Sequence, residues 1–433
     1  MTVAAADSAV ETTLDLIRQI FGGLDQPSIA MRLWDGTTWE PAPGTEAKCT
    51  VVLKHPGALR KMFLTPTELN LAECYLHDDY DIQGEVEALM PVAEQLLAQP
   101  RTFWEKLRIG RRLLSLPGGR WRSRNGFGRA RLSGSEHSVE RDSAAVTHHY
   151  NVSNDFYAIW LDRNMVYSCA LFGSADESLD AAQERKLDYI CRKLRLRPGE
   201  RFLDIGCGWG GLIMHAAREY GAEALGITLS RPQADLANER IRGAGLQDRC
   251  RAEVVDYREL KESGFDKLAS IGMVEHVGEE RLPEYFGAAF ELLKPGGVFL
   301  NHGIGELPGR PRSRKPGFVR TYVFPDSALP SISSVVTAAE DCRFEPRDVE
   351  SLREHYAMTL RHWVRRLEAR QEEAKQEVGE TTYRVWRLYM AGCAHWFAAG
   401  HIAVYQTLLV KRRNGSSGFP LLRNDWYERR SGS

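Results

Sequence analysis

The stretch Asp204-Ile205-Gly206-Cys207-Gly208-Trp209-Gly210-Gly211 joins a short apolar run, Arg201–Ile205, to a segment with helical apolar spacing, Leu212–Tyr220. Glycines between a strand and a helix permit a tight turn and let a ligand approach the backbone closely. The glycine spacing fits GxGxxG, which alone does not distinguish a nicotinamide dinucleotide from another adenosyl ligand. The stretch therefore predicts an adenosyl-ligand site beside the first strand of an α/β sheet.

Apolar runs and helical segments alternate on both sides of this stretch. The expected strands are Arg201–Ile205, Ala224–Thr228, Ala252–Val255, Leu268–Gly272 and Val298–His302, and the expected helices are Leu212–Tyr220, Arg231–Ala244 and Arg281–Leu293. This alternation predicts a doubly wound, mainly parallel α/β sheet. Further along the chain, we expect a helical region over Arg361–Met390 and a final strand over His401–Lys411.

The residues that follow the second and third strands narrow the choice of ligand. A dehydrogenase usually carries an acid at the end of its second strand to bind a ribose hydroxyl. Here that strand ends in Thr228-Leu229-Ser230, followed by Gln233, with no acid. Asp256 and Tyr257 follow the third strand, where a carboxylate can accept from an adenine amino group and a ring can stack on the base. The alternative is that all of these residues only form turns and helix caps.

Length and composition limit the class of protein. The chain has 433 residues, which predicts two or three domains, and 57 Lys and Arg against 58 Asp and Glu give a net charge of -1. This balance gives no general attraction to nucleic acid. The eight cysteines form no CxxC pair, so we expect neither a disulfide framework nor a metal site. We also expect no secretion signal and no membrane-spanning helix, and hence a cytoplasmic location.

The first 115 residues read as a small α+β domain. Ala30–Trp34 and Thr37–Glu40 flank Asp35-Gly36, which is typical of a hairpin turn, and Cys49–Leu53 is another β-branched run. Glu85–Gln99 has helical spacing, and an earlier helix is expected to begin with Thr65 as its N-cap. We expect this domain to serve in lipid binding or in the contact of a homodimer.

A basic segment follows. Arg101–Arg131 contains ten Arg or Lys residues and one acid, Glu105, and its later part belongs to a linker over residues 116–145. One interpretation is a solvated, flexible linker. Another is docking on an anionic lipid surface, with nearby apolar side chains inserted at the interface: Trp104, Leu107, Trp121 and Phe127. Nucleic acid is a third interpretation, but no recognition motif accompanies the charges.

Seven sequence blocks in order carry a family resemblance. They are YSCALF from Tyr167, LDIGCGWG from Leu203, GITLSRPQ from Gly226, DYR from Asp256, SIGMVEHVG from Ser270, LKPGG from Leu293 and HYAMTLRHW from His355. Together they resemble the cyclopropane fatty acid synthase family of S-adenosylmethionine-dependent methyltransferases. The resemblance implies a Rossmann-like class I methyltransferase domain over residues 146–433, with C-terminal helices that cover the substrate.

The resemblance also implies the site residues. Those expected to contact S-adenosylmethionine are Tyr167, Ser168, Asp204, Gly206, Cys207, Gly208, Thr228, Leu229, Ser230, Gln233, Asp256 and Tyr257. Those expected to hold a bicarbonate ion are Cys169, Glu275, His302, Tyr356 and the backbone of Ile304. Cys393 matches a family cysteine regarded as catalytic, so the implied catalytic set is Cys169, Glu275, His302, Tyr356 and Cys393. The chain departs from the family at Asn151, Gly303 and Asp326-Ser327.

The implied reaction adds a methylene across a cis double bond of unsaturated phospholipid acyl chains. The alkene attacks the sulfonium methyl, and the carbocation closes to a cyclopropane when bicarbonate removes a proton. This chemistry needs a dry apolar site and a placed base. Cation-stabilising candidates, each of which is equally consistent with ordinary core, are Tyr322, Phe324, Tyr356 and Trp363. Because the substrate is a membrane lipid, we expect peripheral association with the inner face of the membrane.

Other interpretations stay open. The same cation can yield a methyl-branched or methylene-branched chain, and a small-molecule N-methyltransferase is a more distant enzyme alternative. A non-catalytic lipid-binding partner is the alternative from another class. Considered without the resemblance, His302 is more simply a core histidine and Glu275 a helix cap.

Overall fold

The computed structural model describes residues 3–24, 28–40, 46–118, 141, 152–307, 317–325 and 328–427. The chain forms two compact units. The first comprises Met1–Arg129, Ser313–Val323 and Gln371–His395, and the second comprises Ala130–Arg312, Phe324–Arg370 and Trp396–Ser433. Most of the expected linker, including Trp121 and Phe127, lies outside the described residues, as do Asn151 and Asp326-Ser327. The domain boundaries at residues 115 and 145 stay a prediction.

A seven-stranded sheet forms the centre of the second unit. Its order is β10 (Glu345–Ser351), β11 (Ile402–Val410), β9 (Leu293–Glu306), β8 (Phe265–Ile271), β5 (Arg201–Ile205), β6 (Glu223–Thr228) and β7 (Cys250–Val254). Strands β9, β8, β5, β6 and β7 are parallel, whereas β11 pairs antiparallel with both β9 and β10. The predicted mainly parallel sheet is confirmed, and β10 is an edge strand that the sequence analysis missed.

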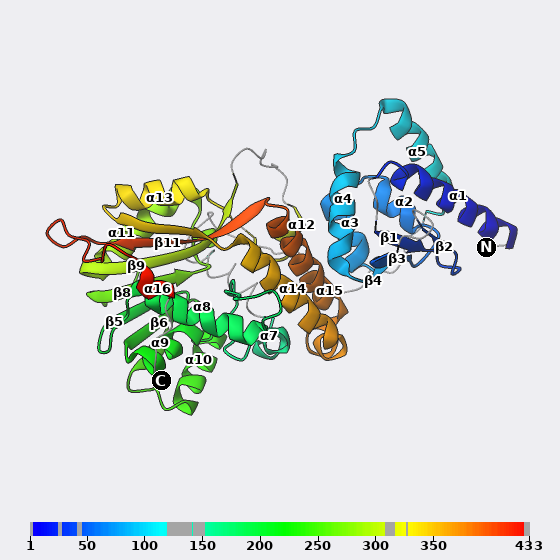
Figure 1. The fold of residues 1–433 in the computed structure, drawn as a ribbon. Helices are drawn as coiled ribbons and strands as arrows, with labels where there is room; N and C mark the ends of the chain where they lie inside the picture. Colours follow the sequence, from blue (N-terminus) through cyan, green and yellow to red (C-terminus); the bar gives the residue numbers. More distant parts are fainter. Residues whose placement is uncertain are drawn as a thin grey trace. The chain divides into compact units, whose positions relative to one another are not determined.

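Helices cover both faces of this sheet, as Figure 1 shows. On one face lie α8 (Leu179–Leu194), α9 (Gly211–Tyr220) and α10 (Arg231–Gly243), and on the other lie α11 (Leu282–Leu292) and α13 (Ile332–Asp341). Successive side chains of a strand point to opposite faces. On β5, Phe202 accordingly packs with α8 and α9, whereas Leu203 packs in the cluster of α11 and α13. The doubly wound architecture follows from these two apolar faces.

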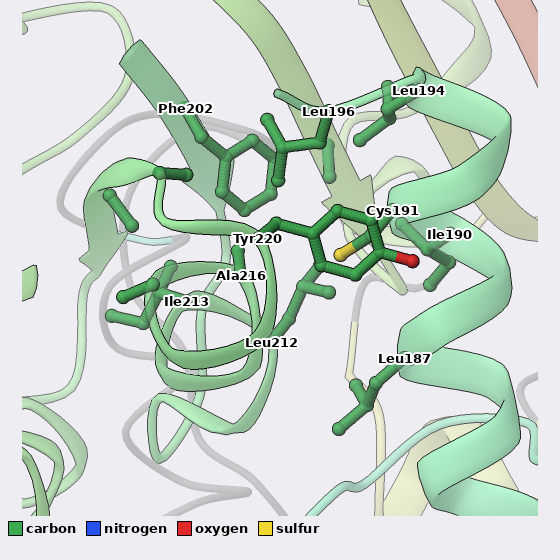
Figure 2. Packing of buried hydrophobic residues seen from close by; sticks show 14 of the residues in the cluster. Leu187, Ile190, Cys191, Leu194, Leu196, Phe202, Leu212, Ile213, Ala216 and Tyr220 are labelled. Atoms are coloured by element: carbon green, nitrogen blue, oxygen red, sulfur yellow. The ribbon is translucent and has the colours of Figure 1, made fainter. Parts of the chain in front are cut away.

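Figure 2 shows the core on the α8 and α9 side of the sheet. Leu187, Ile190 and Leu194 of α8 face Leu212 and other apolar side chains of α9, and all of these residues are buried. The spacing of three or four residues places the α8 leucines and isoleucine on one helical face. This packing fixes the position of α8, and Lys186 of the same helix lines the ligand pocket.

The remaining helical elements of the second unit lie around the carboxyl ends of the strands or pack beside them. They are α7 (Asn154–Trp160), η2 (Val274–His276), η3 (Glu279–Arg281), α14 (Arg353–Ala369) and α16 (Asn424–Tyr427). The hydroxyl of Ser153 caps α7 by accepting from the Phe156 amide at 3.0 Å. Helix α15 (Gln371–Ala398) contributes nearly all of its length to the first unit and changes direction at Gly379, whose φ is 79°.

The first unit contains a four-stranded sheet in the order β2 (Thr38–Trp39), β1 (Ile29–Arg32), β3 (Cys49–Leu53) and β4 (Tyr80–Gly84). The predicted hairpin is confirmed, because Met31 of β1 lies opposite Trp39 of β2. Its helices are α1 (Val3–Phe21), α2 (Ala58–Phe63), α3 (Glu68–Leu76), η1 (Val86–Ala88), α4 (Leu89–Ala98), α5 (Phe103–Ser115) and α12 (Phe318–Tyr322).

Two features of this unit could not be read from local patterns. The expected cap at Thr65 is wrong: helix α3 begins two residues later, and the Thr67 hydroxyl accepts from the Asn70 amide at 3.1 Å. Helix α15 joins the unit through Arg384, which donates to the Tyr75 carbonyl at 2.7 Å and to Asp78 at 3.0 Å. No helix among the described residues is long and apolar enough to cross a bilayer.

Candidate active site

The glycine loop lies at the carboxyl end of β5 and leads into α9. Gly206, Gly208 and Gly210 have φ values of 85°, 53° and 82°, a region that side chains with a Cβ rarely adopt. The amides of Gly206 and Cys207 both donate to the carbonyl of Ile227 on β6, at 2.9 and 3.0 Å. The loop is therefore held against the end of the neighbouring strand, with its backbone open to a ligand.

A fourth glycine, Gly226, lets the glycine loop lie close to β6. A Cβ on Gly226 of β6 would meet the Cys207 Cβ at 2.6 Å and its Sγ at 2.7 Å. It would also meet Ile213 at 2.8 Å. The sequence did not predict Gly226 as a packing requirement, because the contact depends on how two strands and a helix come together.

A pocket opens beyond this loop. It is lined by every residue expected to contact S-adenosylmethionine except Ser230: Tyr167, Ser168, Asp204, Gly206, Cys207, Gly208, Thr228, Leu229, Gln233, Asp256 and Tyr257. Ser230 instead caps α10, where its hydroxyl accepts from the Gln233 amide at 3.4 Å. Carboxyl ends of parallel strands are the usual ligand-binding edge of an open α/β sheet.

Two parts of the pocket wall are held by hydrogen bonds within the protein. Thr228 donates through its hydroxyl to Gln233 at 2.8 Å, and both side chains are buried. Asp256 forms a bidentate pair with Arg258, whose Nε and Nη2 lie 2.9 and 2.8 Å from the carboxylate oxygens. Arg258 also lines the pocket and was not predicted from the sequence, although it is the last residue of the DYR block.

Buried charges lie at another part of the wall. Lys186 of α8 and Asp204 at the end of β5 both line the pocket, and both are almost fully buried. The Lys186 ammonium donates to the Ser168 hydroxyl at 2.9 Å. Burial raises the pKa of Asp204 to about 7, an effect opposed by Lys186. Sequence spacing gave no reason to place Lys186 here, because α8 precedes the sheet strands in the chain.

A second group of side chains adjoins the pocket. Glu275 lies in η2, and its Oε1 accepts from the Ile304 amide at 2.8 Å, while its Oε2 is buried with no partner among the described residues. The neighbouring pocket residue Gly272 donates through its amide to the His302 carbonyl at 2.8 Å. Glu275, His302 and Ile304 are thus held beside the pocket by strand β9 and the segment after β8.

The orientation of His302 is set by the strand next to it. Gln406 of β11 lies opposite His302 of β9, and its amide nitrogen is 3.3 Å from the imidazole Nδ1. An amide N–H donates, so this bond places the imidazole proton on Nε2. The Nε2 atom is buried and has no partner among the described residues. His302 therefore has an unused donor, and Glu275 has an unused acceptor oxygen.

Cys169 and Tyr356 are linked to this group through Leu352. The Cys169 thiol lies 3.7 Å from the Leu352 carbonyl, which also accepts from the Tyr356 amide at 3.0 Å. The Leu352 amide donates to the carbonyl of Val404, which faces Ile304 across the β9–β11 pairing. Backbone hydrogen bonds therefore tie the Tyr356 segment to β11 and so to β9, and the Cys169 thiol reaches the same Leu352 carbonyl.

Burial sets the charge of this group. It raises the pKa of Glu275 to about 7 and raises the pKa of the Cys169 thiol far above its usual range. Burial, together with the ammonium groups of Lys186 and Lys193, lowers the pKa of His302 to about 3. Near pH 7, His302 is a neutral hydrogen-bond donor, Cys169 is a thiol, and Glu275 is close to half protonated.

Aromatic rings line the region between the pocket and this group. The Trp363 ring lies 5.2 Å from that of Tyr167 and 6.0 Å from that of Tyr356, and Trp363 is fully buried. Phe324 lies 5.6 Å from the ring of His276, which lines the pocket. Tyr322 belongs to the first unit, where its hydroxyl donates to Glu73 at 3.0 Å.

Cys393 and the other residues expected to be catalytic belong to different units. Cys393 lies on α15 in the first unit, whereas Cys169, Glu275, His302 and Tyr356 all belong to the second. Burial raises the pKa of Cys393 to about 12. A thiol with this pKa is protonated at neutral pH and is a poor nucleophile.

Comparison with known proteins places this geometry in a family. The family model described as mycolic acid cyclopropane synthetase matches residues 137–407, and a domain of unknown function, DUF7884, matches residues 16–100. A probable fatty acid methyltransferase of Pseudomonas putida is 38% identical over 404 residues, covering 92% of this chain and 96% of that protein. A cyclopropane-fatty-acyl-phospholipid synthase of Escherichia coli is 36% identical over 263 residues, covering 61% of this chain and 66% of that protein.

A solved structure supports the same family. The mycolic acid cyclopropane synthase CmaA1 in complex with SAH and CTAB is 36% identical, with a TM-score of 0.59 over 62% of this chain and 97% of that one. The doubly wound sheet, its glycine loop and the pocket at the strand ends define an S-adenosylmethionine-dependent methyltransferase. Within that class, the chain belongs to the mycolic acid cyclopropane synthetase family.

Proposed function

We propose that this protein transfers a methylene group from S-adenosylmethionine across a cis double bond of unsaturated phospholipid acyl chains, forming cyclopropane fatty acids. The observation that carries the proposal is the pair of unused polar atoms, Glu275 Oε2 and His302 Nε2, buried beside the cofactor pocket. Buried polar atoms without partners are uncommon in proteins, and a bound ligand is one way to complete their hydrogen bonding. The family to which the chain belongs supports cyclopropanation as the reaction.

The residues fit a small oxyanion such as bicarbonate. The Nε2–H of His302 would donate to an anionic oxygen, and a carboxylate at Glu275 would accept the remaining hydroxyl of the ion. Bound there, bicarbonate would supply a base for the proton lost in ring closure. Neutral His302 holds an anion by donation alone, because its pKa of about 3 keeps it from acting as an acid near pH 7.

The protein's own contribution to the chemistry is a dry, aromatic environment. S-adenosylmethionine supplies an electrophilic methyl group, so no protein nucleophile is needed. Trp363 and Tyr356 present ring faces and edges in a buried region, and Tyr167 connects them to the pocket. Aromatic faces stabilise a desolvated cation by up to about 2 kcal/mol, and excluding water prevents its capture as an alcohol.

The substrate class rests on the relatives. The Escherichia coli relative is named for acting on fatty-acyl phospholipids, and the CmaA1 structure contains CTAB. The test is to incubate the purified protein with S-adenosylmethionine, bicarbonate and liposomes of an unsaturated phospholipid, and to identify the lipid product by NMR. A cyclopropane ring at the former double bond is expected, and unchanged lipid would contradict the proposal.

A second outcome of the same reaction is supported by one comparison. The Pseudomonas putida relative, which matches along 92% of this chain, is named a probable fatty acid methyltransferase. A cation that loses its proton from another carbon would give a methyl-branched or methylene-branched chain instead of a ring. The NMR spectrum separates the two outcomes, since only the ring gives upfield cyclopropane protons.

For delivery of the substrate, we propose peripheral docking on an anionic membrane surface through α5. This helix buries Ile109 and Leu113, whereas Phe103 and Trp104 are 70% and 74% exposed. Lys106, Arg108 and Arg111 are also exposed on it. Aromatic side chains beside basic ones are typical of helices that lie in the headgroup region, where each basic residue contributes about 1 kcal/mol.

Liposome flotation tests this docking. The variant Phe103→Ala/Trp104→Ala is expected to bind anionic liposomes at least tenfold more weakly, as is the wild type at high salt. Leu421→Ala/Leu422→Ala is the matched control, because it removes two exposed apolar side chains from the second unit. Binding that is insensitive to salt, to anionic lipid and to the α5 substitutions would contradict the docking proposal.

A further inference from the structure

Helix α8 carries two buried lysines, seven residues apart, with different partners. The Lys193 ammonium lies 2.9 Å from Asp348 and 2.5 Å from Glu350, so its charge is neutralised within the protein. Lys186 donates to the hydroxyl of Ser168 at 2.9 Å and forms no ion pair with any described residue. An ammonium group has three donors, so Lys186 keeps bonding capacity that Lys193 has used.

The pocket next to Lys186 also contains an incompletely bonded negative group. Asp204 lines the same pocket, is 3% exposed, and its Oδ1 has no hydrogen-bond partner among the described residues. The other acid near Lys186 is Asp162, whose carboxylate already accepts from the amides of Asn164 and Val166, each at 2.8 Å. A cation and an anion therefore face one pocket without forming an ion pair with each other.

Leaving two charged groups incompletely bonded in a buried site is unfavourable unless a ligand completes their interactions. The ligand must be zwitterionic to satisfy both. The amino-acid end of S-adenosylmethionine carries an α-carboxylate and an α-ammonium group on one carbon. Burial lowers the pKa of Lys186 only to about 8, so the side chain stays mainly protonated at pH 7.

We propose that Lys186 binds the α-carboxylate of the methionyl part of S-adenosylmethionine, while Asp204 accepts from its α-ammonium group. Ser168 orients the Lys186 side chain through the 2.9 Å hydrogen bond. The inference rests on the use of S-adenosylmethionine by this pocket and adds a residue that recognises one end of it. Lys186 is a cofactor-binding residue in this scheme, and it takes no part in the transfer of the methyl group.

The test compares ligands with and without the amino-acid end. The full chain with Lys186→Met is titrated by calorimetry with S-adenosylhomocysteine and with 5′-methylthioadenosine, which has no carboxylate or ammonium group. We expect the affinity for S-adenosylhomocysteine to fall about tenfold to hundredfold, as for a lost hydrogen bond to a charged group, and that for 5′-methylthioadenosine to change less than about twofold. Lys186→Arg is expected to restore part of the loss.

Lys193→Met is the matched control, because it removes the other buried ammonium of α8 away from the pocket lining. It is expected to lower the thermal midpoint while leaving the affinity for S-adenosylhomocysteine unchanged. Wild-type affinities give a measurement that needs no variant: decarboxylated S-adenosylhomocysteine is expected to bind at least about tenfold more weakly than the intact ligand.

Three results would overturn the inference. One is an unchanged affinity of Lys186→Met for S-adenosylhomocysteine, and another is an equal loss for both ligands, which would indicate a purely structural lysine. Equal wild-type affinity for the intact and decarboxylated ligands is the third. Failure of the wild type to bind S-adenosylhomocysteine at all would instead overturn the proposed function, so the two failures are distinguishable.

Discussion

The cofactor pocket and the four side chains that we propose to hold an anion, called the anion group from here on, differ in how the chain assembles them. Most of the pocket wall comes from the continuous segment that runs through β5, α9, β6 and β7, where each strand end is followed at once by a site residue. The anion group takes Cys169, Glu275, His302 and Tyr356 from distant parts of the chain and joins them through the pairing of β11 with β9. Binding and catalysis should therefore be separable by mutation.

The largest expected effect separates them at Glu275. Glu275→Gln keeps the side-chain volume but removes the carboxylate proposed to hold the bicarbonate base, so product formation should fall by about 10² to 10⁴-fold, the range for a lost general base. Affinity for S-adenosylhomocysteine should stay within about twofold, because Glu275 does not line the pocket. Glu280→Gln, in the same segment but exposed, should be neutral in both measurements. Loss of cofactor binding in Glu275→Gln would contradict the separation of binding from catalysis.

The second effect is the contribution of Glu275 to the pH dependence of stability. The pKa of Glu275 is about 7 in the fold against an ordinary value of 4.5, so the folded state binds more protons than the unfolded state between these values. The stability that Glu275 contributes should fall as the pH rises from about 4.5 to 7 and then level off, by about 3 kcal/mol. Denaturant unfolding of the wild type and Glu275→Gln at each pH isolates this contribution, because Asp204 titrates in both. Parallel curves for the two proteins would contradict it.

A smaller effect belongs to the pocket. Gly226→Ala would place a Cβ 2.6 Å from that of Cys207, and overpacking of this kind typically destabilises by about 1 to 3 kcal/mol. We expect the shifted loop to weaken binding of S-adenosylhomocysteine as well. Gly243→Ala is the control, since a Cβ there meets nothing within 4 Å in helix α10 and should be neutral or slightly stabilising. Unchanged stability and ligand affinity in Gly226→Ala would show that the loop adjusts.

The smallest effect is expected at Cys393, which belongs to the first unit. Its pKa of about 12 keeps the thiol protonated, and no covalent step is required of it. Cys393→Ser should retain turnover within about threefold of the wild type, measured at equal folded fraction. Complete loss of turnover in a well-folded Cys393→Ser protein would restore a chemical role for this thiol.

Sequence patterns predicted the five parallel strands and the helices between them because the strands are mainly apolar and the helices have regularly spaced apolar residues. They missed β10 and β4, whose sequences Glu345–Ser351 and Tyr80–Gly84 are largely polar and become strands only by pairing with a neighbour. The cap at Thr67 was misplaced to Thr65, since two threonines two residues apart satisfy the same local rule. Local patterns therefore predicted most of the helices and strands, but they predicted less well where these elements begin and end.

The same limit applies to the site. Pocket residues directly after a strand were predictable from their position, but Lys186 and Gly226 depend on contacts between elements that no spacing reveals. Gly303, which departs from the family, also has a packing reason: a Cβ there would meet Val274 at 2.1 Å. The unused atoms of Glu275 and His302 became visible only when the pairing of β9 with β11 was known.

The discontinuous first unit has a consequence for synthesis on the ribosome. Arg384 bonds to the Tyr75 carbonyl, 309 positions earlier, and to Asp78, so the amino-terminal sheet emerges long before its α15 partner exists. At about 5 to 20 residues per second, that delay is roughly 15 to 60 s. During this interval the nascent chain exposes the surface that α15 later covers, and transiently exposed surfaces of this kind are prone to aggregation.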